Sequence, residues 1–343
     1  MARSPTGEGR RSRPVRARRG VALAAAGALV IAACGGGTGG RRGTDTGPAV
    51  RTTDRAATTG TTGTTGPATT RPPRPCPPGP FRDVPYVRDG DRLQRLDVYP
   101  PAGTCPAPVV VWVHGGGWIT GDKENVGAKR DWARRHGWVL VSVNYRLTDP
   151  RAPEPLRWPA HNEDVAAALA FLRSEAGRFG GDPDRIALLG HSAGAVIAAA
   201  LANDPRYLGA HGMPLGALAC VAPLDTEGFD VAGPASRSGW LGRLYRQAFG
   251  DDPAVWREAS PITHVRAGTG IPPTFLVQRD GPPWRRAMVD RYASALRQAQ
   301  VAVTVVELPG FTHADVNRRI GTPGEDVLTP ALDRFLGRCL AGA

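Results

Sequence analysis

Near its N-terminus the sequence lacks a hydrophobic run long enough to span a membrane. The apolar segment runs only from Val21 to Ala33, whereas a transmembrane helix needs about 20 residues. It follows an arginine-rich stretch, Arg10 to Arg19, and ends just before Cys34 and three glycines. A basic region followed by a short apolar segment is typical of an export signal. Residues 1–33 are therefore predicted to be a signal peptide.

The sequence from Ile31 to Cys34 resembles the lipobox of bacterial lipoproteins, in which small residues precede a cysteine that becomes the lipidated mature N-terminus. The resemblance implies lipid attachment at Cys34 and a place on the extracytoplasmic face of the cell membrane. The alternative is a plain secretory signal with an incidental cysteine, which would give a secreted protein.

Most of the chain also lacks an excess of charge, although the formal net charge is +12. Residues 1–33 hold seven Arg and one Glu, and residues 34–75 hold six Arg and two Asp. Residues 1–75 therefore carry +10 of the net charge of +12, which leaves a net +2 for residues 76–343. No basic stripe with interleaved aromatic residues occurs there, so a nucleic-acid partner is not expected.

Cysteines are few, and four remain once Cys34 is set aside. An even number outside the cytoplasm permits disulfides. Cys76 and Cys105 bracket a hairpin-like stretch and are predicted to pair. Cys220 lies in an apolar run and is predicted to be a small buried residue, and whether it meets Cys339 stays open.

Residues 34–80 lack apolar surface and consist mainly of Gly, Thr, Pro and Arg. Such a segment cannot bury enough surface to fold. It is predicted to be a disordered tether that holds a folded domain away from a membrane surface.

From residue 81 onward, short apolar strand-like runs alternate with longer helical stretches. This alternation predicts one α/β domain with a mainly parallel sheet over residues 81–343. The strand-like runs are Leu93–Tyr99, Val109–Val113, Val139–Asn144, Ile186–Leu189, Leu215–Val221, Pro273–Gln278 and Val301–Leu308.

One strand–turn–helix pattern carries a serine at its tip. The segment Gly190–Gly194 reads Gly-His-Ser-Ala-Gly, follows the apolar run Ile186–Leu189 and precedes a stretch of small residues. A strained turn lifts a serine hydroxyl clear of the backbone, and flanking glycines avoid crowding there. Ser192 is therefore the predicted nucleophile.

A second glycine motif lies upstream. The strand-like run Val109–Val113 leads directly into His114–Trp118, which reads His-Gly-Gly-Gly-Trp. Acyl transfer places negative charge on a former carbonyl oxygen, and backbone N–H groups must already point at that position. The N–H groups of Gly116, Gly117 and Ala193 are the predicted oxyanion donors, with an ordinary glycine turn as the alternative.

These two motifs together resemble the α/β-hydrolase superfamily, and within it the carboxylesterases that carry His-Gly-Gly-Gly-Trp. The resemblance implies an eight-stranded, mostly parallel sheet with helices on both faces and the nucleophile after the fifth strand. Hormone-sensitive-lipase-like relatives place cap helices before the His-Gly-Gly-Gly-Trp segment, here called the glycine loop (His114–Trp118). In this chain the residues before that loop are predicted to form strands. The feruloyl-esterase-like and kynurenine-formamidase-like branch is therefore the more similar one.

The family order of the triad is Ser, Asp, His, and His313 follows the last strand as the resemblance requires. Relatives end the seventh strand with His-Gly-x-x-Asp, whereas this chain reads Gln278-Arg279-Asp280. Asp280 is the expected acid, although it comes early. Asp225, after the preceding strand, is the alternative, and Asp315 lies too close to His313 in sequence.

The resemblance implies a serine carboxylesterase that hydrolyses small to medium esters through an acyl-enzyme, without a metal or an organic cofactor. Trp118, Trp240 and Phe249 are candidates for the wall of the acyl pocket, and simple surface packing is the alternative. An amidase, formamidase or peptidase of the same fold is one competing function. A non-catalytic, surface-binding lipoprotein is another.

Overall fold

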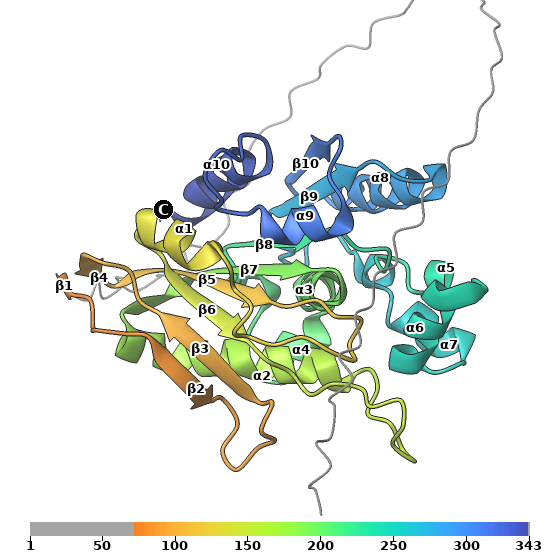
Figure 1. Ribbon diagram of the computed structural model, residues 1–343, viewed down its shortest axis with the longest axis horizontal. Coiled ribbons are helices and arrows are strands. Elements are labelled where there is room, and N and C mark those ends of the chain that lie inside the picture. The colour runs from red at the N-terminus through yellow and green to blue at the C-terminus, as the bar shows by residue number, and fades with distance from the viewer. Residues whose placement is uncertain (1–71, 342–343) are drawn as a thin grey trace, which may run out of the picture. The chain divides into compact units, whose positions relative to one another are not determined.

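The centre of the fold is an eight-stranded sheet with the order β10-β9-β8-β7-β5-β6-β3-β2 (Figure 1). The computed structural model describes residues 72–341, so the predicted signal peptide and Cys34 lie outside the described part. Six strands pair in parallel, namely β10, β9, β8, β7, β5 and β6, while β3 is antiparallel to β6 and β2 is antiparallel to β3. The strands are β2 (Phe81–Pro85), β3 (Arg95–Tyr99), β5 (Ala107–Val113), β6 (Val139–Val143), β7 (Gly181–His191), β8 (Cys220–Leu224), β9 (Thr274–Arg279) and β10 (Val303–Leu308).

The central strands are apolar on both faces because helices cover both sides of the sheet. In β5, Val109 and Val111 belong to one buried cluster, which includes residues of α2 (Ala160–Glu175) and α3 (Ala193–Asn203). Val110 and Trp112 belong to another, which includes residues of α1 (Lys129–Arg135) and α10 (Leu328–Leu340). The expected α/β-hydrolase architecture is confirmed.

The strand ends decide where the chemistry can lie. Among the strands of the large sheet, β7 is the fifth in chain order, and it runs directly into Ser192 and α3. The loops after β5, β8 and β10 leave the sheet at the same edge, because these strands are parallel to β7. Two further helices follow the last two strands: α8 (Pro283–Gln298) follows β9, and the short α9 (His313–Arg318) follows β10.

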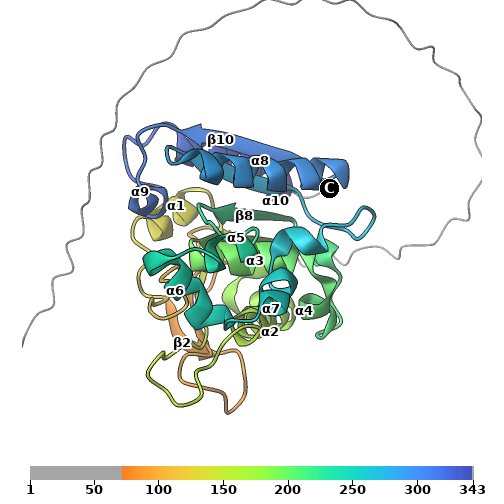
Figure 2. The same cartoon turned by 90° about the vertical axis from the view of Figure 1, so that its right-hand side faces the viewer.

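Three short helices between β8 and β9 form a separate group beside the sheet (Figures 1 and 2). They are α5 (Ala232–Ala235), α6 (Gly239–Phe249) and α7 (Pro253–Glu258). The rings of Tyr245 and Phe249 in α6 pack edge-on against Trp118, with centroids 5.1 and 4.9 Å away. This contact fastens the helices to the loop that follows β5. A further short helix, α4 (Pro205–Gly209), follows α3.

At the N-terminal end, the folded part begins before the boundary predicted at residue 81. The two-residue strand β1 (Arg74–Pro75) pairs with β4 (Thr104–Cys105), and a disulfide joins Cys76 to Cys105. The predicted cysteine pair is therefore confirmed. The prediction of a disordered tether is wrong for residues 74–76, which the strand pairing and the disulfide hold. Cys220 is buried, as expected, and both it and Cys339 are free thiols.

None of the helices between residues 72 and 341 combines the length and the apolar character that a membrane-spanning segment requires.

Candidate active site

Ser192 stands on a sharp turn between β7 and α3. Its backbone has φ 58° and ψ −118°, a conformation that costs a non-glycine residue free energy and persists only when the surroundings enforce it. A side chain at Gly190 would collide with the backbone of Gly194, and one at Gly194 would collide with the carbonyl of Val113. The glycines on both sides of Ser192 are thus required by backbone crowding, as the motif predicts.

The predicted oxyanion donors are backbone groups with no acceptor of their own. Gly116 and Gly117 have φ values of 118° and 61°, and Ala193 is the first residue of α3. Between residues 72 and 341, no protein acceptor pairs with the N–H groups of these three residues. All three residues line one cavity together with Ser192. Preorganised donors of this kind can stabilise a developing oxyanion.

Two histidines of the motifs support the loops. His114 donates from Nδ1 to the carbonyl of Gly115 at 2.7 Å, and its ring stacks on Tyr145 at 4.6 Å. His191 donates from Nε2 to the carbonyl of His313 at 2.9 Å. Burial, reinforced by the nearby His313, lowers the pKa of His191 to about 3. Burial also lowers the pKa of His114, so both rings act as neutral hydrogen-bonding groups.

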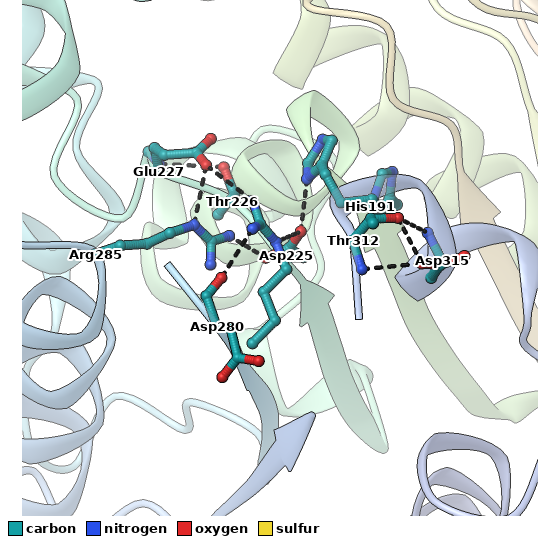
Figure 3. Close-up of polar contacts among 11 residues, drawn as sticks. His191, Asp225, Thr226, Glu227, Asp280, Arg285, Thr312 and Asp315 are labelled. Carbon is teal, nitrogen blue, oxygen red and sulfur yellow. Dashed lines mark hydrogen bonds and ion pairs between the residues drawn. The ribbon is translucent and has the colours of Figure 1, made fainter. Parts of the chain in front are cut away.

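His313 is the first residue of α9, where a capping box holds it. The side chain of Thr312 accepts from the N–H of Asp315, and the Asp315 carboxylate accepts from the Thr312 N–H at 2.9 Å (Figure 3). Such a reciprocal pair fixes the start of a helix. Asp315 therefore orients the backbone at His313 and is not bonded to its ring.

The acid that binds His313 is Asp225, and the expectation of Asp280 is wrong. Nδ1 of His313 donates to Oδ2 of Asp225 at 2.5 Å, and the side chain of Asp225 is fully buried. Asp280 is exposed, and its Oδ2 accepts instead from the N–H of Gly310 at 2.7 Å. Figure 3 shows the Asp280 carboxylate turned away from Asp225. Asp280 thus fastens the loop that carries His313, and Asp225, the alternative acid, supports the ring.

Asp225 is held by two arginines that the sequence reasoning did not assign to the site. Arg279 donates from Nε to Oδ2 of Asp225 at 2.7 Å, and Arg285 donates to Oδ1. Arg285 also donates to Glu227 at 3.1 Å. Burial by itself raises the pKa of Asp225, but the bond from His313 and the charges of Arg285 and Arg279 lower it to about 2. The carboxylate is therefore ionised at neutral and mildly acidic pH.

A sequence signal existed for Arg279 but not for Arg285. Arg279 occupies the position where the related pattern has glycine, and such a departure next to an expected catalytic residue indicates a changed site. No sequence pattern reveals that Asp225 has a φ of 53°, which takes its backbone out of the extended conformation of the preceding strand.

His191, Asp225 and His313 bring potential metal ligands within 4.8 Å of one another. This cluster fits a cation poorly, because two guanidinium groups already offset the charge of Asp225. Nε2 of His191 is likewise used as a donor to a carbonyl. The donor set thus favours proton transfer over metal binding.

A cavity of about 570 Å³ opens at these residues. The glycine loop His114–Trp118, Ser192 and His313 form one part of its wall, and α6 supplies another. Trp118 and the exposed Trp240 line it as expected, whereas Phe249 packs behind Trp118. The further lining residues include Leu241, Leu244, Tyr245, Glu227, Arg279 and Arg318.

Comparison with known proteins agrees with this architecture. A family model described as alpha/beta hydrolase fold matches residues 110–316, and one described as a carboxylesterase family matches residues 65–149. Esterase LipQ of Mycobacterium tuberculosis is 32% identical over 258 residues, which cover 69% of this chain and 59% of LipQ. Carboxylesterase NlhH of the same species is 31% identical over 259 residues, which cover 71% of this chain and 75% of NlhH.

Solved structures show the same fold at lower identity. Thermogutta terrifontis esterase 2, phosphonylated by sarin, superposes with a TM-score of 0.62 at 21% identity, over 78% of this chain and 98% of the other. A truncated carbohydrate esterase from gut microbiota gives 0.62 at 18% identity, over 77% and 97%. The chain spans 59% of LipQ and 57% of LipC, less than two thirds of each. The matched fold, the serine turn and the glycine loop together establish that the chain belongs to the α/β-hydrolase fold family.

Proposed function

We propose that the protein is a serine carboxylesterase that hydrolyses small to medium carboxylic esters through an acyl-enzyme. One observation carries the proposal. Ser192, held at φ 58°, shares a cavity with a histidine whose Nδ1 is bonded to a buried carboxylate. The Nδ1 bond leaves Nε2 of His313 free to accept a proton.

In the first half-reaction, Oγ of Ser192 attacks the carbonyl carbon of the ester while Nε2 of His313 takes the hydroxyl proton. The carbonyl oxygen becomes an oxyanion, which the N–H groups of Gly116, Gly117 and Ala193 stabilise. When the tetrahedral species collapses, the bond to the alcohol oxygen breaks. His313 then returns its proton to the departing alcohol.

In the second half-reaction, water replaces the alcohol. His313 takes a proton from the water as its oxygen attacks the acyl carbon, and the same donors hold the new oxyanion. The bond to Ser192 breaks, the serine regains its proton from His313, and the carboxylic acid leaves. Asp225 stays ionised throughout and stabilises the imidazolium each time it forms.

The test is covalent labelling together with turnover. We expect a fluorophosphonate probe to label the full chain, and the Ser192→Ala variant to remain unlabelled. We also expect hydrolysis of p-nitrophenyl acetate by the wild type. A folded wild type that neither labels nor hydrolyses the ester would support the non-catalytic alternative. Hydrolysis of p-nitroanilides at rates similar to those of esters would favour the amidase or peptidase alternative.

The finer assignment within the family is also a proposal. We infer similarity to the feruloyl-esterase-like and kynurenine-formamidase-like branch, since residues 72–106 form only strands and turns ahead of the glycine loop. No cap helix precedes the loop in this described stretch. Comparing methyl ferulate and N-formylkynurenine with p-nitrophenyl acetate tests the inference, which fails if the first two are not hydrolysed.

We propose further that Cys34 carries a lipid and that the domain is held at the extracytoplasmic face of the cell membrane. The support is the sequence alone: the short apolar segment and the cysteine that follows it. Metabolic labelling with an alkyne-tagged fatty acid should mark the protein, and Cys34→Ala should abolish both the label and the membrane fraction. Release of the unlabelled wild type into the medium would support the secreted alternative.

A further inference from the structure

The buried carboxylate of Asp225 contacts two cations in addition to the ring that it supports. Oδ2 of Asp225 accepts two bonds at once, from His313 Nδ1 at 2.5 Å and from Arg279 Nε at 2.7 Å. The other oxygen, Oδ1, accepts from Arg285. Both oxygens are therefore committed, and the plane of the carboxylate is fixed from both ends.

The position of Arg279 follows from the order of the strands. Asp225 follows β8, His313 follows β10 by a short loop, and β9 lies between these strands in the sheet. Arg279 is the last residue of β9. The acid therefore reaches its histidine across the end of a strand that carries this arginine, and the arginine binds the very oxygen that faces the ring.

The guanidinium of Arg279 is itself held. Nη1 donates to the carbonyl of Asp280 at 3.1 Å, and Nη2 lies 3.8 Å from a Glu227 carboxylate oxygen. Its side chain is 17% exposed and lines the cavity. Arg285 is more deeply buried, at 4% exposed, and divides its donors between Asp225 and Glu227. Of the two arginines, only Arg279 touches the oxygen that His313 uses.

We propose that Arg279 is a positioning residue, which fixes Oδ2 of Asp225 in line with Nδ1 of His313 and offsets part of the carboxylate charge. The inference rests on the proposed esterase function for its kinetic consequences. The family pattern places the acid after β9, whereas Asp225 follows β8. The backbone of Asp225 also has a positive φ. Arg279 then supplies the fixed hydrogen bond that makes an acid on β8 usable.

Two effects follow from this arrangement. Without the Nε bond, only Arg285 at Oδ1 and His313 itself at Oδ2 hold the carboxylate, so it can turn about the Arg285 bond. The ring of His313 is then held less firmly, which lowers kcat. Without the cation, the full charge of Asp225 stabilises protonated His313 more strongly. The imidazolium then loses its proton, and becomes able to act as a base, only at a higher pH. Loss of Arg279 should therefore move the acid limb of the pH–rate profile upward.

The experiment compares Arg279→Ala, Arg279→Lys and Arg286→Ala in the full chain with p-nitrophenyl acetate. Arg286 is the control, because it pairs with Glu307 on the exposed side of α8 and does not contact Asp225. We expect Arg279→Ala to lower kcat about 10- to 100-fold with little change in KM. Its acid limb should rise by about one pH unit. Arg279→Lys should restore the limb but only part of kcat, since an ammonium lacks the planar fork.

Other outcomes overturn the proposal. An unchanged kcat and an unchanged pH profile in Arg279→Ala would do so. A lowered melting temperature with an unchanged pH profile would also do so, because it would show that Arg279 has only a structural role. A rise in KM confined to anionic esters would make Arg279 a substrate-binding residue instead. If Arg279→Ala does not fold, an unchanged kcat in Arg279→Lys is enough to reject the proposal.

A spectroscopic readout separates this inference from the proposed function. The proton between His313 and Asp225 should give a downfield NMR signal in the wild type, which Arg279→Ala should shift or broaden. If the wild type is inactive yet the signal responds to Arg279→Ala, the esterase proposal fails and the positioning contact stands. If the wild type is active and the signal does not respond, the positioning proposal fails alone.

Discussion

The ring of His313 and the carboxylate of Asp225 are joined by a hydrogen bond of 2.5 Å, although 88 residues separate them in the chain. The bond spans the end of β9, because the two residues follow β10 and β8. The backbone of the serine turn is tied to the end of β8, since the N–H of Ser192 donates to the carbonyl of Leu224, the last residue of that strand, at 3.1 Å. Asp225, His313 and Ser192 are therefore positioned by one edge of the sheet.

The two candidate acids can be separated by a pair of isosteric variants. We expect Asp225→Asn to lower kcat for p-nitrophenyl acetate about 10³- to 10⁴-fold, because the amide no longer selects the productive tautomer of His313. Asp280→Asn should cost less than about tenfold, since an amide oxygen can still accept from Gly310. A larger loss in Asp280→Asn than in Asp225→Asn contradicts this assignment.

Stability should depend on pH through Asp225. Its pKa falls from 3.8 to about 2 on folding, so the ionised carboxylate stabilises the native state above pH 3.8. This contribution, about 2 kcal/mol, is lost as the pH falls through about 2. Urea unfolding of the wild type and Asp225→Asn at a series of pH values should show a gap that narrows over that window. Asp280→Asn is the control, and a gap that stays constant down to pH 2 refutes the linkage.

The glycine loop should not tolerate a side chain at Gly116. Its φ is 118°, and an added Cβ would collide with the carbonyl of Thr120. Gly116→Ala should displace the oxyanion donors and lower kcat about 10²- to 10³-fold, the usual effect of losing one such donor. Gly233→Ala, in open space at ordinary backbone angles, is the matched control. Equal kinetics in the two variants would argue against an oxyanion role for the loop.

The acyl-chain preference should respond to Leu244 of α6. This side chain lines the cavity and lies against the glycine loop, since a Cβ at Gly117 would come within 2.6 Å of Leu244 Cδ1. Leu244→Ala should shift the best kcat/KM in a series of p-nitrophenyl esters toward longer acyl chains. The exposed neighbour Arg243, which does not line the cavity, supplies the control variant Arg243→Ala. An identical chain-length profile in wild type and Leu244→Ala would rule out this wall.

The disulfide should contribute to stability and not to catalysis. Cys76 and Cys105 close a loop with a separation of 29 residues, at the opposite end of β5 from the glycine loop. Replacing both by Ala should cost about 3 kcal/mol through the entropy of the unfolded chain. Thermal unfolding of the double variant measures the loss, and unchanged kcat at a permissive temperature is expected. A large fall in kcat with an unchanged melting temperature is the contrary result.

Local patterns predicted the parts of the site that depend on neighbouring residues. Gly190 and Gly116 are required by crowding against backbone only four residues away, so these parts of the two motifs are readable in the chain. The apolar runs predicted the strands, because parallel strands buried on both faces are continuously hydrophobic. His313 was found because it follows the last such run. The disulfide was predicted from two cysteines that flank one short stretch.

The acid could not be read in the same way. Asp225 and Asp280 each follow a predicted strand, and the sequence does not reveal the positive φ of Asp225 or the Gly310 N–H that occupies Asp280. The folded start of the domain was missed as well, because β1 depends on pairing with a distant strand, β4.

By itself, then, the sequence determined the fold class, the serine turn, the glycine loop and the histidine, all of which follow from local backbone geometry and from burial. Only the tertiary structure decided which carboxylate binds the histidine and which two arginines bind that carboxylate. The reason is physical: a triad acid is selected by distance and by compensation of buried charge. Both are properties of three strand ends brought together, and no single segment of chain contains them.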